Sequence, residues 1–179
     1  KMVSKAVRHL GIIKKNDEYG TPIDSVKPLH SFKDAVKRLK CSPRIDYFAS
    51  KSNHVLKEYL TKKDNALEYA WTKNGFINPP YSKIKKVMKK AYEEHRKNNV
   101  ELMILTYNKT DTEWWHRYVE NCPNCEVHFV KGRIRFLNPR GKLTKLSAPY
   151  PSCWIIYRRM IDQVSTDKEW ESNSEKKIG

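Results

Sequence analysis

The residues Asn78-Pro79-Pro80-Tyr81 combine two hydrogen-bond acceptors with a flat aromatic ring. An exocyclic amine on a nucleobase is a poor nucleophile because its lone pair is delocalised into the ring, and acceptors that bind the amine draw the lone pair out of conjugation. The Asn78 amide oxygen and the Pro79 carbonyl are such acceptors. Tyr81 offers a face on which a base can stack. These four residues predict a catalytic loop for a base amine; the alternative is a rigid turn with Tyr81 in the core.

This loop lies between a predicted strand and a predicted helix. The apolar run Gly75–Ile77 precedes it and is typical of a buried strand. Apolar residues at helical spacing follow it and predict a helix over residues 83–98, with Ser82 suited to cap it. The prolines cannot continue a strand ladder, so they hold the loop stiff. Ligands bind at the carboxyl ends of strands in open α/β sheets, which favours the catalytic interpretation.

Apolar patterns predict the other elements of the chain. They indicate an α/β domain over residues 17–159, with a basic lead-in at 1–16 and a polar tail at 160–179. We expect a Rossmann-like mixed sheet, parallel in its first half and antiparallel after residue 125, with helices on both faces. Helices are predicted at 1–16, 22–26, 31–39, 50–59, 83–98 and 112–118, and strands at 44–49, 75–77, 100–106, 126–130, 132–136 and 153–157.

The composition indicates a globular domain with a polyanionic partner. The 179 residues include 39% hydrophobic and 31% charged residues, and no run is long enough to cross a membrane. Lysine and arginine number 36 against 20 acids, a formal net charge of +16, which favours DNA, with RNA possible, over an anionic membrane surface. The alternative is an effect of charge on solubility alone. No secretory signal opens the sequence, so we expect the cytoplasm, or wherever host or viral DNA is located.

The four cysteines are Cys41, Cys122, Cys125 and Cys153. The spacing of Cys122 and Cys125 is that of a zinc knuckle, but a structural zinc needs four ligands and no second tight pair is present. We therefore expect no metal, and a surface turn that holds two free thiols.

Six blocks of the sequence, in one order over residues 17–157, resemble the phage-type DNA adenine-N6 methyltransferase (Dam) family. Single motifs are weak signals, whereas six in order are specific. The blocks are Asp17-Glu18-Tyr19-Gly20-Thr21-Pro22, Asp46-Tyr47-Phe48-Ala49-Ser50, Trp71 with residues 76–82, residues 110–116, Gly132-Arg133-Ile134-Arg135-Phe136 and Ala148-Pro149-Tyr150-Pro151-Ser152.

The resemblance implies a methyltransferase fold and S-adenosylmethionine as the cofactor. Where the family tends to have Asp-Pro-Cys-Ala, this chain has Asp46-Tyr47-Phe48-Ala49, and it contains no G-x-G. By itself, an acid such as Asp46 at a strand end can bind ribose hydroxyls or an ammonium group, and Asp64 can accept from an exocyclic amine. The predicted cofactor-binding residues are Tyr19, Gly20, Thr21, Pro22, Asp46, Phe48, Ala49, Ser50, Asp64 and Asn78.

Basic residues beside the predicted crevice are candidates for nucleic-acid binding. A lysine-rich helix begins directly after the catalytic loop, and the loop 107–111 follows the next strand, so both face the same edge of the sheet. Phosphate contact and simple solvation both remain open for these side chains. The predicted nucleic-acid-binding residues are Lys83, Lys85, Lys86, Lys109, Thr110, Arg133 and Arg135.

Together the motifs predict methyl transfer from S-adenosylmethionine to the exocyclic amine of a flipped adenine in DNA. One alternative is the same chemistry on RNA adenine, the cytosine amine or a protein glutamine. The other is a catalytically inactive DNA-binding subunit on a methyltransferase scaffold. The missing Gly-rich loop favours that subunit, whereas the intact Asn78-Pro79-Pro80-Tyr81 block opposes it.

Overall fold

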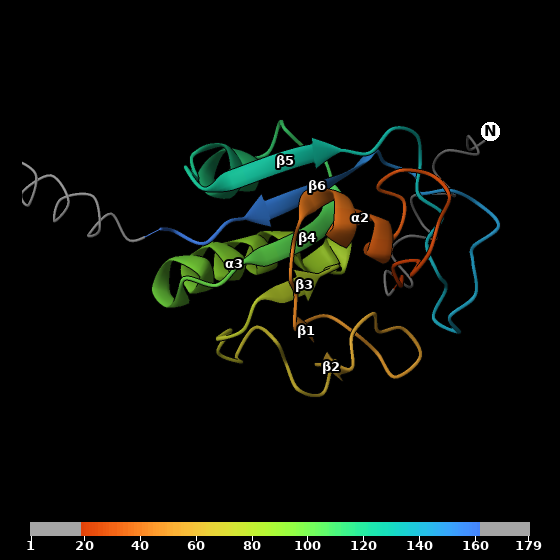
Figure 1. Cartoon of the computed structure of the whole chain (residues 1–179), viewed down its shortest axis with the longest axis horizontal. Coiled ribbons are helices and arrows are strands. Elements are labelled where there is room, and N and C mark those ends of the chain that lie inside the picture. The colour runs from red at the N-terminus through yellow and green to blue at the C-terminus, as the bar shows by residue number, and fades with distance from the viewer. Residues whose placement is uncertain (1–18, 162–179) are drawn as a thin grey trace, which may run out of the picture.

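The computed structural model describes residues 19–161, in which six strands form one twisted sheet (Figure 1). From edge to edge the strands are β2 (Glu58–Tyr59), β1 (Ile45–Asp46), β3 (Gly75–Ile77), β4 (Leu102–Tyr107), β6 (Ser152–Tyr157) and β5 (Cys125–Phe129). The helices are α2 (Phe32–Leu39), α3 (Ile84–Asn98) and α4 (Glu113–Trp115), with a 3-10 turn η1 (Tyr81–Lys83) and a π-helical turn η2 (His116–Glu120).

The sheet is parallel from β2 through β1 and β3 to β4. β6 then runs antiparallel to both of its neighbours, β4 and β5. The change of pairing falls after residue 125, as the sequence predicts. Because β3 and β4 are parallel, the loops that follow them leave the same edge of the sheet.

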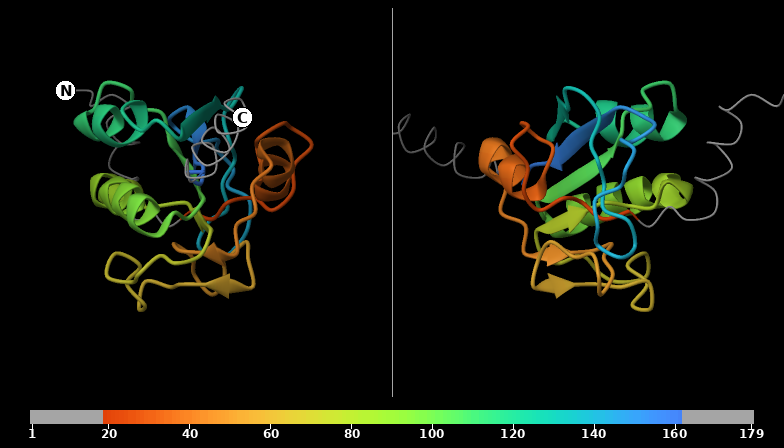
Figure 2. Two further views of the ribbon diagram at one scale, coloured as in Figure 1. Left: turned by 60° about the vertical axis from the view of Figure 1, so that its left-hand side comes forward. Right: turned by 90° about the vertical axis from the view of Figure 1, so that its right-hand side faces the viewer.

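Helices cover both faces of the sheet (Figure 2). On one face, α3 buries Val87 and Met88 in a core that includes Ile104 and Ile155. On the other face, α2 packs against the sheet, where Phe32 meets the ring of Phe76 edge-on at 5.0 Å between centroids. The predicted α/β class, with a mixed sheet between two helical layers, is therefore confirmed.

Two predicted helices are absent from the described residues. Instead of forming a helix, residues 22–26 offer the Pro22 and Ile23 carbonyls to the first amides of α2 and so cap that helix. The stretch 50–59 loops back and ends in β2, because Leu60 N–H donates to the Asp46 carbonyl at the sheet edge. In both places a tertiary hydrogen bond overrides the helical spacing.

Two other boundaries differ from prediction. Residues 132–136 form no strand of the sheet: Gly132 lies in a bend, and residues 134 and 136 accept backbone bonds from residues 148 and 144. α3 begins through the turn η1, so Ser82 lies inside that turn and Lys83 takes the N-cap position. The predicted lead-in 1–16 and most of the predicted tail, residues 162–179, lie outside the described residues. Within residues 19–161, no helix has the length and apolar character that a membrane crossing requires.

Candidate active site

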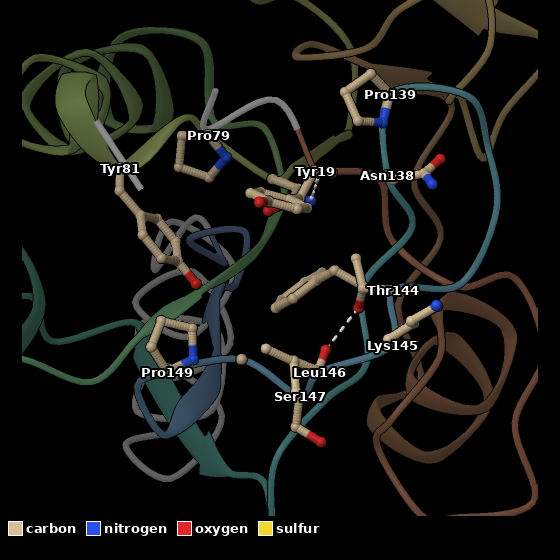
Figure 3. A pocket seen from close by; sticks show the side chains of 13 residues that line it. Tyr19, Pro79, Tyr81, Asn138, Pro139, Thr144, Lys145, Leu146, Ser147 and Pro149 are labelled. Carbon is tan, nitrogen blue, oxygen red and sulfur yellow. Dashed lines mark hydrogen bonds between the residues drawn. The ribbon is translucent and has the colours of Figure 1, made fainter. Parts of the chain in front are cut away.

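A pocket of about 440 Å³ lies where β3 ends and the Asn-Pro-Pro-Tyr loop, residues 78–81, begins. Its lining comes from this loop, from Tyr19, and from a segment far along the chain. We call residues 138–149 the strap. Figure 3 shows Pro79 and Tyr81 across the pocket from Thr144 and Lys145 of the strap. The lining residues are Tyr19, Asn78, Pro79, Tyr81, Phe136, Asn138, Pro139, Thr144, Lys145, Leu146, Ser147, Ala148 and Pro149.

The Asn78 side chain is held by one end of its amide. Its Nδ2 donates to the Tyr19 carbonyl at 2.8 Å. This bond fixes which end of the amide is nitrogen, and no group among residues 19–161 donates a hydrogen bond to Oδ1. The site therefore presents an acceptor oxygen whose orientation is set before any ligand arrives.

Tyr81 belongs to an aromatic cluster beside the loop. Its ring meets Tyr107 edge-on, with 4.5 Å between centroids, and Tyr107 in turn contacts Tyr150 at 5.7 Å and Trp114 at 6.3 Å. Burial raises the pKa of the Tyr81 phenol well above its ordinary value, with a further upward contribution from Tyr107. Tyr81 is thus a neutral, packed ring, which is suited to a contact surface and not to service as a base.

The strap is fastened to two other parts of the chain. Its edge pairs with residues 134–136 through two amides, Thr144 N–H to the Phe136 carbonyl at 2.8 Å and Ala148 N–H to the Ile134 carbonyl at 2.7 Å. Its first residues accept bonds from Asn53 Nδ2 and Ser52 Oγ. The bonds from Ser52 and Asn53 join residues more than eighty positions apart in the chain. The local sequence therefore does not predict that the strap lines the pocket.

The opening block, residues 19–22, lies beside the pocket. Tyr19 lines it, and Gly20 exchanges two backbone hydrogen bonds with Leu137 next to the strap, at 2.9 and 2.7 Å. A Cβ on Gly20 would lie 2.6 Å from the Asn53 side chain, so only glycine permits this close approach. Thr21 is buried and Pro22 caps α2, so both support the wall rather than line it.

Asp46 lies in β1 and is 2% exposed. Its carboxylate accepts from Phe48 N–H at 3.3 Å and from Val55 N–H at 3.2 Å. Burial raises the pKa of Asp46 to about 7, although both hydrogen bonds act in the opposite direction. Asp46 does not line the pocket and, in this arrangement, ties the loop 48–55 to the sheet.

The other predicted cofactor residues also lie away from the pocket lining. Phe48 packs edge-on against Trp71, and Ala49 N–H donates to the Leu60 carbonyl. Ser50 closes a tight turn with Asn53. Asp64 accepts from the Thr61 amide and hydroxyl, both at 2.7 Å, and these bonds lower the pKa of Asp64.

The predicted nucleic-acid-binding residues fall into three groups. Lys85 and Lys86 border a shallow hollow of about 230 Å³ between α3 and α4, whereas Lys83, Lys109 and Thr110 lie in η1 and in the loop after β4. Arg133 and Arg135 instead donate to carbonyls of the strap. The hollow is also lined by Lys89, Glu113, Trp114, Arg117 and Tyr118. Lys89 belongs to the lysine-rich helix that the sequence predicts beside the crevice, whereas Arg117 was not predicted.

The cysteines are all free thiols. Cys122 is buried and Cys125 is half-buried, so the turn they share is not the surface turn that the sequence predicts. Among residues 19–161, no cluster of three or more histidine, cysteine or acidic side chains is arranged to hold a metal ion.

The mixed sheet, with its Asn-Pro-Pro-Tyr loop at the carboxyl end of β3, defines a methyltransferase-like fold. The profile of the family described as DNA N-6-adenine-methyltransferase (Dam) matches residues 27–176, and the chain belongs to this family. The chain is also 31% identical over 104 residues to a DNA N-6-adenine-methyltransferase of Escherichia phage T1, a match covering 49% of this chain and 43% of that relative. No solved structure matches the chain.

Proposed function

We propose that this chain transfers a methyl group from S-adenosylmethionine to the exocyclic amine of adenine in DNA. The observation that carries the proposal is the Asn78 side chain, which lines the pocket. Its Nδ2 is tethered to the Tyr19 carbonyl, and its Oδ1 has no donor among residues 19–161. Family membership supports the same reaction. The matched phage T1 relative bears the name of this activity, although the match spans less than half of its length.

The Asn-Pro-Pro-Tyr loop supplies the chemistry on the acceptor side. Asn78 Oδ1 and the Pro79 carbonyl accept the two hydrogens of the amine, which draws the nitrogen lone pair out of the ring. Pro79 has no N–H to compete for the amine, and the fixed φ of both prolines keeps the carbonyl in place. Much of the rate enhancement then comes from positioning, so no strong general base is required.

The target adenine must leave the duplex stack to reach this loop. Tyr81 lines the pocket next to Asn78 and Pro79, and its packing against Tyr107 keeps its ring fixed. A rigid aromatic surface costs little conformational entropy when a base stacks on it. We propose that Tyr81 holds the flipped base while the Asn78 and Pro79 oxygens hold its amine.

The pocket lining fits S-adenosylmethionine in chemical character. Tyr19, Phe136 and Pro139 offer flat apolar surface for an adenine ring, and Asn138, Thr144 and Ser147 add polar groups. When bound, the cofactor supplies an electrophilic methyl group. Within the opening block we assign the contact to Tyr19, with Gly20, Thr21 and Pro22 as its support. Asp46, Phe48, Ala49, Ser50 and Asp64 stay predictions for the remainder of the cofactor site.

For the nucleic-acid path we propose the hollow between α3 and α4. Lys85, Lys86, Lys89 and Arg117 line it with a single acid, Glu113. The aromatic contacts from Tyr81 through Tyr107 to Trp114 connect the pocket wall to this hollow. A strand whose base occupies the pocket would thus have cations within reach of its neighbouring phosphates. Lys83, Lys109 and Thr110 complete the proposed path.

Identification of the methylated product tests the proposal. The protein is incubated with isotope-labelled S-adenosylmethionine and with duplex DNA, single-stranded RNA or protein, and each digest is analysed by mass spectrometry. We expect labelled N6-methyladenine from DNA. Label on RNA adenine, cytosine or glutamine would assign the chemistry to another acceptor. Cofactor-free DNA binding without any labelled product would identify an inactive DNA-binding subunit.

A further inference from the structure

The inner wall of the pocket includes a stretch of the strap that makes few backbone bonds. Residues 145–147 line the pocket, yet none of their amides donates a backbone hydrogen bond that the described residues accept. The strap's pairing amides, Thr144 and Ala148, flank this stretch on either side. The wall is therefore held mainly at its two ends, and within it the Leu146 carbonyl accepts from the Thr144 hydroxyl at 2.7 Å.

Two arginines fasten those ends. Arg135 donates from Nε and Nη2 to the Thr144 carbonyl at 3.1 and 2.8 Å. Arg133 donates from Nη1 to the Pro149 carbonyl at 2.7 Å. The carbonyls that they hold flank residues 145–147: Thr144 directly precedes this stretch, and Pro149 lies two residues beyond its end. Hydrogen bonds from a charged donor are stronger than neutral ones, so these contacts are a substantial part of what holds the wall.

The sequence pattern explains why both arginines reach the strap. Arg133 and Arg135 alternate with Ile134 and Phe136 along an extended segment. Ile134 and Phe136 are 0% and 8% exposed, and both belong to the core that packs against α2. Side chains alternate in direction along an extended chain, so anchoring the apolar pair in the core presents both arginines on the opposite side.

We infer that Arg133 and Arg135 are positioning residues that hold the strap against the pocket, and that they are not phosphate contacts. The strap contains no acidic residue between Asn138 and Pro149, so neither arginine has a carboxylate in the strap to pair with. Arg133 Nη1 and Arg135 Nε and Nη2 donate to backbone oxygens of the strap. The effect on ligand binding in this inference rests on the proposed function, whereas the effect on the strap does not.

Hydrogen exchange of the unliganded protein tests the holding role. In Arg135→Ala we expect the Thr144 and Ala148 amides to exchange about tenfold faster, since a charge-assisted bond at the strap is lost. Arg135→Lys keeps the charge but loses the guanidinium that donates from two nitrogens, so we expect exchange rates between those of the wild type and Arg135→Ala. Arg140→Ala is the matched control, because it removes a strap charge with no side-chain bond among the described residues. Unchanged exchange in Arg135→Ala would overturn the inference.

Binding measurements test the link to the pocket and the exclusion of phosphate contact. We expect S-adenosylmethionine affinity by calorimetry to fall several-fold in Arg135→Ala and to stay unchanged in Arg140→Ala. The salt dependence of DNA binding should keep the wild-type slope in Arg135→Ala. A salt slope shallower by about 0.9 in Arg135→Ala would show a phosphate contact and overturn the inference. Unchanged cofactor affinity in Arg135→Ala, when its strap amides exchange faster, would also overturn it. Wild-type protein that binds no cofactor would refute the proposed function and leave the exchange result to decide the strap's role.

Discussion

At the scale of single residues, the site depends on which polar groups are already satisfied. The Asn78 amide uses its nitrogen on the Tyr19 carbonyl and lines the pocket, and its oxygen is the acceptor in the proposed reaction. Asp46 differs, since both of its oxygens accept backbone amides and its side chain is buried. Residue type alone does not show how a polar side chain is used in the fold, whereas its hydrogen-bond partners do.

The buried state of Asp46 predicts a pH dependence of stability. Its pKa is 3.8 ordinarily and about 7 in the folded protein, with burial as the main cause. The folded state therefore holds more protons than the unfolded state between these values, and the free energy of unfolding falls as pH rises through them. The full effect is on the order of 4 kcal/mol.

Urea unfolding at about pH 5 and about pH 8 measures this slope. Asp46→Asn removes the titrating group, so we expect a flatter dependence on pH whatever the absolute stability of the variant. Equal slopes in the two proteins would mean that Asp46 is ionised in the fold.

The local sequence allowed part of the site to be predicted. The loop 78–81 could be placed because its own prolines and its flanking strand and helix fix it within a short stretch. The strap could not, since its place in the pocket depends on Gly20, Asn53 and residues 134–136. Contacts of such long range leave no periodic pattern in a single sequence.

At the scale of elements, β3 is short and wholly buried, and it leads into the loop 78–81, for which we propose the catalytic role. Gly75 begins it, beneath the Tyr47 ring, which stacks on Trp71 at 4.6 Å. The Tyr47 hydroxyl donates to the Lys73 carbonyl just before the strand. Glycine is thus required at this position by close packing, and not by a left-handed backbone.

Gly75→Ala should destabilise the protein by about 1–3 kcal/mol, because a Cβ there would overlap the Tyr47 ring. Thermal or urea unfolding measures the loss. The same substitution in a Tyr47→Leu background should cost less, since the overlapping ring is gone, and the double-mutant cycle isolates the clash. Equal costs in both backgrounds would place the strain elsewhere.

The elements that were predicted correctly are those with strong periodicity or continuous apolar runs. α3 and β4 follow their patterns closely. The expected helix over 50–59 failed because Asp46 draws that segment toward the sheet edge, through Val55 N–H and Leu60 N–H. The carboxylate of Asp46 accepts the Val55 amide and its backbone carbonyl accepts the Leu60 amide, and the helical spacing of residues 50–59 does not predict either bond.

At the scale of the whole molecule, lysines that contribute to the formal net charge of +16 lie on both faces of the sheet. Lys85 and Lys86 line a hollow beside the pocket wall, on the face of the sheet covered by α3 and α4. Lys27 and Lys37 are exposed on the side of α2, which packs on the opposite face. If the position of a charge decides its effect, Lys85 and Lys86 contribute more to DNA binding than Lys27 and Lys37, although the two pairs carry equal charge.

Lys85→Ala with Lys86→Ala should weaken DNA binding for all sequences alike. We expect the log-log salt slope to become shallower by up to about 1.8, or 0.9 for each phosphate contact. Binding titrations at several salt concentrations measure this, and cofactor affinity should be unaffected. The pair Lys27→Ala with Lys37→Ala is the control and should leave the slope nearly unchanged. Equal slopes in both double variants would show that the lysines act only through total charge.

The central claim is that Asn78 Oδ1 accepts the amine of the target base. The most direct test is the single-turnover rate of labelled methyl transfer to DNA by Asn78→Ala and Asn78→Asp. Loss of one transition-state acceptor should lower the rate of Asn78→Ala by about 10²–10³-fold, with the fold and cofactor affinity retained. Asn78→Asp keeps an acceptor but loses the bond to the Tyr19 carbonyl, so it should retain clearly more activity than Asn78→Ala. A near-wild-type rate in Asn78→Ala, or equal losses in the two variants, would contradict the account.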